Sequence, residues 1–237
     1  GEGIELTGSD VLLQCSSLAS EVAIFEIWGS LLNGASIAIL PAKSASHRDL
    51  GQVLAQHRVT TAWFPTRLLH QLAIEQIEAL KSLRQIFTGG DALSPQVVKQ
   101  LERLPDCRLI NTYSLPEITG LTCYNPAVTL PSAHASISIG RAIAGTQTFI
   151  LDRYCQPVPI GVVGDLYLGG DRLSPGYYNR PELNDRKFIA HPFSSHPADR
   201  LYQTDYLARY LADGAIELVS PTATLPSSER VEIRRIE

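Results

Sequence analysis

The sequence of 237 residues contains no methionine and only four cysteines. Without a methionine it includes no translation start, so we expect it to be a segment of a longer chain. The cysteines are Cys15, Cys107, Cys123 and Cys155. They form no Cys-x-x-Cys pair, and no histidine lies at metal-ligand spacing from them. This pattern favours reduced thiols of a cytoplasmic protein over zinc ligands or disulfides.

Long apolar runs and an excess of basic residues are also missing. No uninterrupted apolar stretch approaches 18 residues and no signal peptide is recognisable, so we expect neither secretion nor a membrane-spanning helix. The net charge of −4 gives no reason to expect nucleic acid or an anionic membrane as a partner. With 44% hydrophobic and 19% charged residues, the composition is typical of a globular protein with a sizeable core.

Helical and strand patterns alternate along the first 125 residues. Helices are predicted over residues 19–32, 47–57 and 66–75, with another beginning at Ser94-Pro95. Strands are predicted over residues 36–40, 59–64, 84–88 and 107–111. This alternation predicts an α/β fold, in which a parallel sheet carries flanking helices. Ligands bind at the carboxyl ends of strands in such sheets, so we expect a site in the loops after Phe64, Thr88 and Asn111.

The pattern changes at about residue 136. Short strands are predicted over residues 148–152, 162–169, 201–210 and 215–219, separated by Pro, Gly and Asp turns. Residues 164–188 indicate a strand, an extended loop and a short helix. The whole pattern predicts a small antiparallel sheet or barrel. We therefore divide the chain into an α/β subdomain (1–135, incomplete at its N-terminal side), a small β subdomain (136–219) and a hinge or linker (220–237).

Three segments combine chemistry-bearing residues with turn signals. In FTGGDALSP (87–95) the paired glycines let backbone N–H groups approach a phosphate closely, although an ordinary strand–helix turn explains the same residues. In NTYSLPEITG (111–120) a tyrosine could stack on a purine and a glutamate could hold a divalent ion. The alternative is a proline-broken loop with a solvated glutamate. YQTDYLARYLADG (202–214) could be a ligand site or an exposed hairpin.

Five segments in order resemble one family. They are CSSLASEVAIFEIWGSLLNGA, FTGGDALSP, NTYSLPE, the pair LDRYCQPVPIGVVGDLYLGG and LSPGYYNRPELNDRKF, and YQTDYLARYLADGAIELV. Together they resemble the adenylation domains of nonribosomal peptide synthetases, within the adenylate-forming ligase superfamily. The resemblance implies part of the large N-terminal subdomain, with a parallel sheet, flanking helices and a small antiparallel barrel or sheet. Residues 220–237 would then be the hinge and the start of a missing C-terminal lid.

The resemblance also implies an activity and partners. The family activates a carboxylic acid with Mg-ATP and passes it to the thiol of a carrier protein. The expected partners are therefore neighbouring synthetase domains, condensation and carrier protein, in the same polypeptide. The implied nucleotide-site residues are Gly89, Gly90, Asp91, Asn111, Tyr113, Glu117 and Tyr206, with Glu117 as the Mg ligand. The implied acid pocket consists of Glu21, Phe25, Ala62, Phe87, Thr112, Gly120 and Leu121. No residue is assigned as catalytic.

Several motif positions depart from the family. Tyr206 stands where the family has its ribose-binding aspartate, and Asp205 stands at the preceding glycine. A phenol cannot accept two hydroxyl hydrogen bonds as a carboxylate does. A one-residue slip in an extended segment turns a side chain to the opposite face, so we do not expect Asp205 to replace the lost carboxylate. The remaining departures are Pro116 for threonine, Glu21 for aspartate, Arg172 and Pro175 for glycine and arginine, and residues 220–223 at the hinge.

These departures lead to one hypothesis and two alternatives. The hypothesis is a degenerate, catalytically inactive adenylation domain that acts as a structural or docking element in a nonribosomal peptide synthetase, with no assigned cofactor. The first alternative is a fragment of an active amino- or keto-acid-activating domain that uses Mg-ATP and loads a carrier protein. The second is a sensor that binds a small ligand or nucleotide without chemistry.

Overall fold

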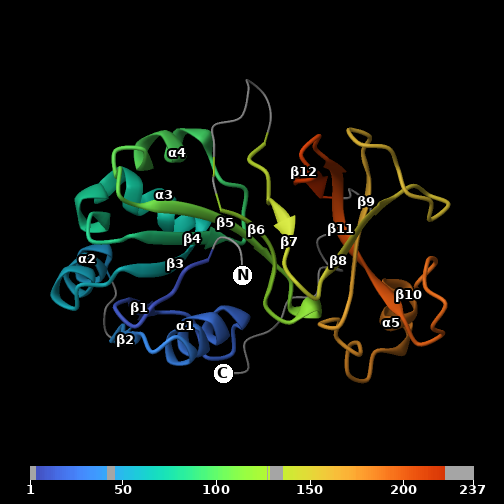
Figure 1. Ribbon diagram of the computed structural model, residues 1–237, viewed down its shortest axis with the longest axis horizontal. Coiled ribbons are helices and arrows are strands. Elements are labelled where there is room, and N and C mark those ends of the chain that lie inside the picture. The colour runs from blue at the N-terminus through green and yellow to red at the C-terminus, as the bar shows by residue number, and fades with distance from the viewer. Residues whose placement is uncertain (1–3, 42–45, 127, 129–135, 222–237) are drawn as a thin grey trace.

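The computed structural model describes residues 4–41, 46–126, 128 and 136–221, which form two β-sheets with helices (Figure 1). The first sheet contains β1 (Val11–Gln14), β2 (Ser36–Ile39), β3 (Thr61–Pro65), β4 (Gln85–Gly89), β5 (Arg108–Ser114), β6 (Leu121–Asn125) and β7 (Arg141–Ala142). Its strand order is β2-β1-β3-β4-β5-β6-β7. The four pairings from β2 to β5 are parallel, and those of β6 with β5 and β7 are antiparallel.

The second sheet is antiparallel and has the order β10-β11-β9-β8, with β12 paired to β11. It contains β8 (Gln147–Leu151), β9 (Gly164–Gly169), β10 (Phe188–Ala190), β11 (Arg200–Tyr210) and β12 (Ile216–Pro221), and a short helix α5 (Pro181–Lys187) precedes β10. The predicted antiparallel sheet is therefore confirmed. Residues 220 and 221 of the predicted hinge or linker pair with β11. Residues 222–237 of the predicted hinge lie outside the described residues.

Helices cover both faces of the first sheet. They are α1 (Glu21–Leu32), α2 (His47–Gln56), α3 (Thr66–Glu75) and α4 (Pro95–Leu101), with 3₁₀ turns η1 (Ile77–Leu80) and η2 (Pro116–Ile118). Serine N-caps begin α1, α2 and α4, and the cap at Ser94 was predicted from the sequence. Apolar residues of α2, α3 and α4 share one core cluster with Phe64 and Ile86. On the opposite face the ring of Phe87 meets Phe25 of α1, with centroids 4.8 Å apart.

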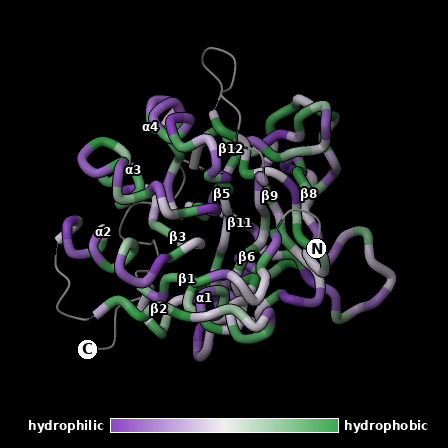
Figure 2. Tube along the Cα trace, turned by 60° about the vertical axis from the view of Figure 1, so that its left-hand side comes forward, coloured by the Kyte–Doolittle hydropathy of each residue, from purple (hydrophilic) through white to green (hydrophobic). Residues whose placement is uncertain are grey.

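The two sheets share a core. Tyr113 and Ile139 from the first part of the chain pack in one cluster with Leu166, Ala208 and Ile216 of the second sheet. The backbone also joins them, because the N–H of Ile139 donates to the carbonyl of Ile216 at 2.9 Å. Figure 2 shows apolar stretches along the strands in the interior and hydrophilic stretches on α2 and α4. The division at residues 135 and 136 stays a prediction, and β7, just after it, belongs to the first sheet.

The sequence prediction missed four short strands and one strand end. β1, β6, β7 and β10 were not predicted, whereas β5 was predicted to end at Asn111 and continues to Ser114. Asn111 and Tyr113 therefore lie within a strand, and the loop after Asn111 was wrongly placed. Among the described residues, no helix is both long enough and apolar enough to cross a membrane.

An ion pair between the exposed Arg84 and the buried Asp10, at the start of β1, supports the first sheet. The Arg84 Nη2 atom lies 2.8 Å and 2.7 Å from the two carboxylate oxygens of Asp10. The Thr60 hydroxyl donates to Asp10 at 2.8 Å, and the Thr7 N–H donates at 2.9 Å. Burial raises the pKa of Asp10, but these hydrogen bonds outweigh it and lower the pKa from 3.8 to about 2. The ionised carboxylate is therefore more stable in the folded than in the unfolded chain.

Replacing Asp10 by Asn is expected to lower the free energy of unfolding by about 2 kcal/mol at neutral pH. The folded pKa of Asp10 lies below its unfolded value, so its contribution is complete above pH 4. It is lost as the pH falls from about 4 to 2, and the native chain and the variant should converge there. Urea unfolding at pH 7 and pH 3 measures this difference. Asp106→Asn, at an exposed carboxylate, is the control and should change little at either pH.

Candidate functional site

The glycine turn after β4 lies against the end of β5. A Cβ atom on Gly89 would come within 2.5 Å of the Thr112 carbonyl oxygen, so only glycine permits this close approach. The Thr66 hydroxyl lies 3.0 Å from the carbonyl of Gly89 and 3.1 Å from that of Asp91, which fixes the turn. Gly90 has a φ of 96° and open space around it. The predicted residues Gly89, Gly90 and Asp91 therefore form a rigid turn at the carboxyl edge of the sheet.

Tyr113 is a core residue of this structure. Its side chain is 7% exposed, and its ring meets that of Tyr206 edge to face, with centroids 5.8 Å apart. Burial raises the pKa of Tyr113 well above its ordinary value, and the neighbouring Tyr206 adds to this effect. The predicted nucleotide-site residues Tyr113 and Tyr206 are therefore brought together, and both pack in the apolar cluster that the two sheets share.

Asp205 and Tyr206 point to opposite sides of β11. The carboxylate of Asp205 accepts a hydrogen bond from the Lys187 ammonium at 2.5 Å, and Lys187 is itself buried. Tyr206 contacts Tyr113 instead. The alternation of an extended strand explains this arrangement. These contacts agree with the expectation that Asp205 does not replace a carboxylate at position 206.

Glu117 lies in η2 and is held by Tyr177, which lies in the loop between β9 and α5. The Tyr177 hydroxyl donates to its carboxylate, and the Tyr177 and Tyr202 hydroxyl oxygens are 3.3 Å apart. Burial, followed by the hydrogen bond to Glu117, raises the pKa of Tyr177 above its ordinary value. Within the described residues no group of three His, Cys, Asp or Glu side chains could hold a metal ion. Glu117 thus offers one carboxylate, of which one oxygen accepts the Tyr177 hydroxyl, and a nucleotide-bound Mg²⁺ needs only one or two protein carboxylates beside the phosphates, so Glu117 fits the predicted role.

Asn111 is committed to the backbone. Its side-chain amide donates to the Ser138 carbonyl at 3.0 Å, and the side chain is 5% exposed. It therefore ties β5 to the segment that leads into β7, and a ligand would have to displace this contact.

Four of the predicted pocket residues meet on the α1 face of the first sheet. Phe25 contacts Phe87, and Glu21 at the start of α1 accepts a hydrogen bond from the Ser114 hydroxyl at 3.2 Å. Thr112, on the same face of β5 as Ser114, accepts a hydrogen bond from the Trp63 indole N–H at 3.2 Å. The sequence prediction missed Ser114 and Trp63.

The other three predicted pocket residues have different positions. Leu121 pairs with Ser114 between β6 and β5, and Gly120 precedes it with a φ of 90°. Ala62 was wrongly placed in the pocket, because it is 1% exposed and packs in the core that α2, α3 and α4 cover. The pleat of β3 brings Trp63 to the pocket face instead.

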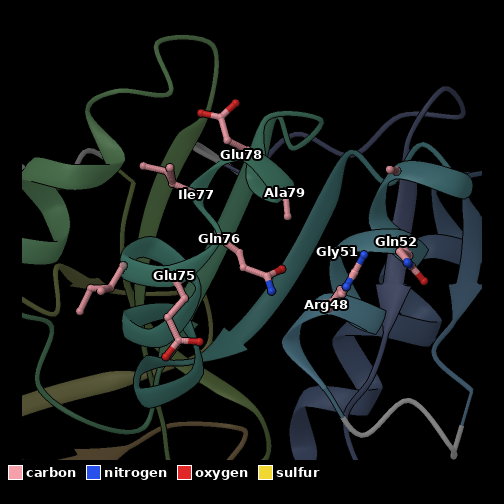
Figure 3. Close-up of a pocket in the computed structure, with 10 residues that line it drawn as sticks. Arg48, Gly51, Gln52, Glu75, Gln76, Ile77, Glu78 and Ala79 are labelled. Carbon is pink, nitrogen blue, oxygen red and sulfur yellow. The ribbon is translucent and has the colours of Figure 1, made fainter.

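One cavity lies away from all these residues. It measures about 480 Å³ and opens between α2 and the segment from α3 to η1. Figure 3 shows Arg48, Gly51 and Gln52 on one wall and Glu75, Gln76, Ile77, Glu78 and Ala79 on the other. None of the predicted site residues borders it.

Comparison with known proteins places the chain in a family. Residues 2–178 match the family model described as AMP-binding enzyme. A linear gramicidin synthase protein of Brevibacillus parabrevis is 43% identical over 216 residues, which are 91% of this chain and 4% of that protein. Bacitracin synthase 1 of Bacillus licheniformis is 38% identical over 218 residues, again 91% of this chain and 4% of that protein. The chain therefore spans only a small part of these relatives.

Solved structures agree with the sequence relatives. The structure of holo-PA1221, a nonribosomal peptide synthetase protein containing adenylation and PCP domains, matches with a TM-score of 0.85 and 30% identity. The match covers 93% of this chain and 38% of PA1221. The Klebsiella oxytoca NpsA N-terminal subdomain matches with a TM-score of 0.80 at 22% identity, over 91% of this chain and 53% of that one, and supports the fold alone. The chain belongs to the AMP-binding enzyme family and corresponds to part of the adenylation domain of a nonribosomal peptide synthetase.

Proposed function

We propose that this adenylation-domain segment keeps the family fold but does not bind ATP, and that it serves as a structural or docking element of a synthetase. The observation that carries the proposal is the position of Tyr206. Its ring packs against Tyr113 between the two sheets, and the neighbouring Asp205 is paired with Lys187.

A nucleotide would have to separate Tyr206 from Tyr113 before it could bind. Separating an aromatic pair costs about 0.5–1.5 kcal/mol beyond the loss of buried area. The incoming ribose would then meet a phenol, which offers one acceptor oxygen on a bulky ring where a carboxylate offers two. Both obstacles act on the same nucleotide and together disfavour its binding.

The proposed setting is a multidomain synthetase. PA1221 carries adenylation and PCP domains in one protein, and the curated relatives are many times longer than this chain. We therefore take a carrier protein and a condensation domain of the same polypeptide, in the cytoplasm, as the partners. Nothing in the charge or hydropathy of the chain favours a nucleic acid or a membrane instead.

One observation favours the active alternative. Glu21, Phe25, Phe87 and Thr112 still meet on one face of the sheet, as an acid pocket requires. An active domain would use this pocket to position an amino or keto acid for reaction with Mg-ATP and then load a carrier protein.

Pyrophosphate exchange distinguishes the two functions. With the full-length synthetase, a panel of amino and keto acids and Mg-ATP, we expect no exchange assignable to this domain. PA1221 assayed in parallel is the positive control, because it is an adenylation-domain protein of the same fold. Saturable exchange that disappears in the Glu117→Ala variant would contradict the proposal. ATP binding without exchange would favour the sensor alternative.

A further inference from the structure

A small polar cavity of about 260 Å³ lies at one end of the second sheet. Its wall includes Gln147 at the start of β8, Asp171 and Ser174 after β9, and His191, Asp199 and Arg200 before and at the start of β11. None of these residues belongs to the predicted nucleotide site or acid pocket. The cavity is smaller than the roughly 300–1,000 Å³ of pockets for drug-sized ligands, which favours a small solute.

The backbone around the cavity is held in place. Gly170 has a φ of 105°, and a Cβ atom there would come within 2.3 Å of the Gly145 carbonyl oxygen. The Asp171 N–H donates to the same carbonyl at 3.1 Å. The end of β9 therefore lies directly on the turn before β8, and the position of Asp171 is fixed by contacts of its own backbone.

His191, in the wall of the cavity, has a defined arrangement of hydrogen-bond donor and acceptor atoms. Nδ1 of His191 accepts the N–H of Phe193 at 3.1 Å. The proton of the neutral ring must then be on Nε2, which lies 3.2 Å from Oε1 of Gln147. Because Oε1 is used in this way, the NH₂ group of Gln147 is the part of the amide that can donate to a ligand.

Arg200 supplies a positive charge with a fixed orientation. One guanidinium nitrogen donates to the Pro175 carbonyl at 2.9 Å, and the guanidinium carbon lies 5.4 Å from the centroid of the Phe188 ring. Within the part of the chain that the structure describes, Arg200 forms no ion pair. Its remaining N–H groups can therefore bind a carboxylate in the bidentate geometry that arginine favours.

Negative charge lies on the same wall. Asp171 forms no ion pair among the described residues, and it does not pair with Arg200 across the cavity. Asp199 accepts a hydrogen bond from the Ser194 hydroxyl at 2.5 Å and lies 3.6 Å from Nδ1 of His196. A cation and an anion that line one small cavity without meeting each other suit a ligand that carries both charges.

We propose that this cavity binds a small zwitterion, a free α-amino acid, with its carboxylate on Arg200 and its ammonium group on Asp171. The amide of Gln147 and the hydroxyl of Ser174 provide further polar contacts. The site is independent of the acid pocket, which lies on the α1 face of the first sheet. Its function is binding, and no chemical step is required.

Isothermal titration of the full-length protein tests this proposal with L-alanine as the probe. We expect saturable binding of L-alanine, and at least about tenfold weaker binding of acetate and of methylammonium, which each carry one of the two charges. The Arg200→Gln variant should weaken L-alanine binding at least about tenfold. Asp171→Asn, at an exposed residue, should weaken L-alanine binding to a similar extent and checks the first variant.

Three outcomes would overturn the proposal. One is the absence of L-alanine binding to the native protein. Another is acetate binding as tight as that of L-alanine, which would indicate a simple anion site. The third is loss of binding in a Glu21→Gln variant with retention in Arg200→Gln, which would place L-alanine in the acid pocket. The inference does not depend on the proposed loss of ATP binding, and pyrophosphate exchange tests that loss separately.

Discussion

Under the proposed function, replacing Asp205-Tyr206 by Gly-Asp is expected to give the full-length protein tighter ATP binding than that of the native protein. The change removes the ring that packs on Tyr113 and places a carboxylate at the same position of β11. A carboxylate that accepts two ribose hydroxyls contributes about 3 kcal/mol, which corresponds to at least about a hundredfold in affinity. Equilibrium dialysis with labelled ATP and Mg²⁺ measures the effect.

Two single variants separate the effect of the Tyr206 ring from that of the Asp205 carboxylate. Tyr206→Phe keeps the ring and removes only the hydroxyl, so it should bind ATP no better than the native protein. Asp205→Gly removes the partner of Lys187 and leaves Tyr206 in place, so it should also fail to bind. ATP binding by either one would contradict the view that the Tyr206 ring fills the site. A folded double variant without ATP binding would show that the site has been lost beyond this pair of residues.

The double variant should also be less stable than the native protein. It loses the contact between Tyr206 and Tyr113 and leaves the buried ammonium of Lys187 without its carboxylate. A buried charge left without its partner is costly, and the loss of packing adds to this cost. Circular dichroism of each variant is therefore needed before its ATP binding is interpreted.

Local sequence signals predicted the fold well where they were strong. The helix over residues 66–75 has the predicted bounds, and Ser94-Pro95 begins a helix as expected. β7 was missed because a strand of two residues is too short for a period to show. β5 continued past Asn111 because its pairing with β6, which no local pattern reveals, extends it to Ser114.

The site was predicted less completely, for two physical reasons. Neighbouring residues of a strand point to opposite faces of the sheet. An error of one position in β3 therefore assigned Ala62 to the pocket and missed Trp63. The second reason is that a substitution in sequence does not show what the new side chain contacts. The loss of an aspartate at position 206 was visible, but the packing of Tyr206 on Tyr113 and the pairing of Asp205 with Lys187 required the structure.

The joint between the two sheets depends on Gly140, which immediately precedes β7. Its φ is 81°, and a Cβ atom there would lie 1.9 Å from the Tyr124 carbonyl oxygen in β6. The carbonyl of Gly140 accepts the N–H of Ile216 at 2.7 Å, and β12 begins at Ile216. Any side chain at this position would force β6, β7 and β12 apart at the point where the two sheets share their core.

Gly140→Ala is therefore expected to lower the free energy of unfolding by at least about 4 kcal/mol, a large part of the roughly 5–15 kcal/mol of a typical protein. Gly214→Ala is the matched control, because Gly214 has nearly the same φ, 82°, and open space where its Cβ would lie. The control measures the cost of a left-handed backbone alone, about 1 kcal/mol. Urea unfolding followed by the fluorescence of Trp28 and Trp63 gives both values. Equal losses in the two variants would show that the close approach of Gly140 to β6 does not hold the sheets together.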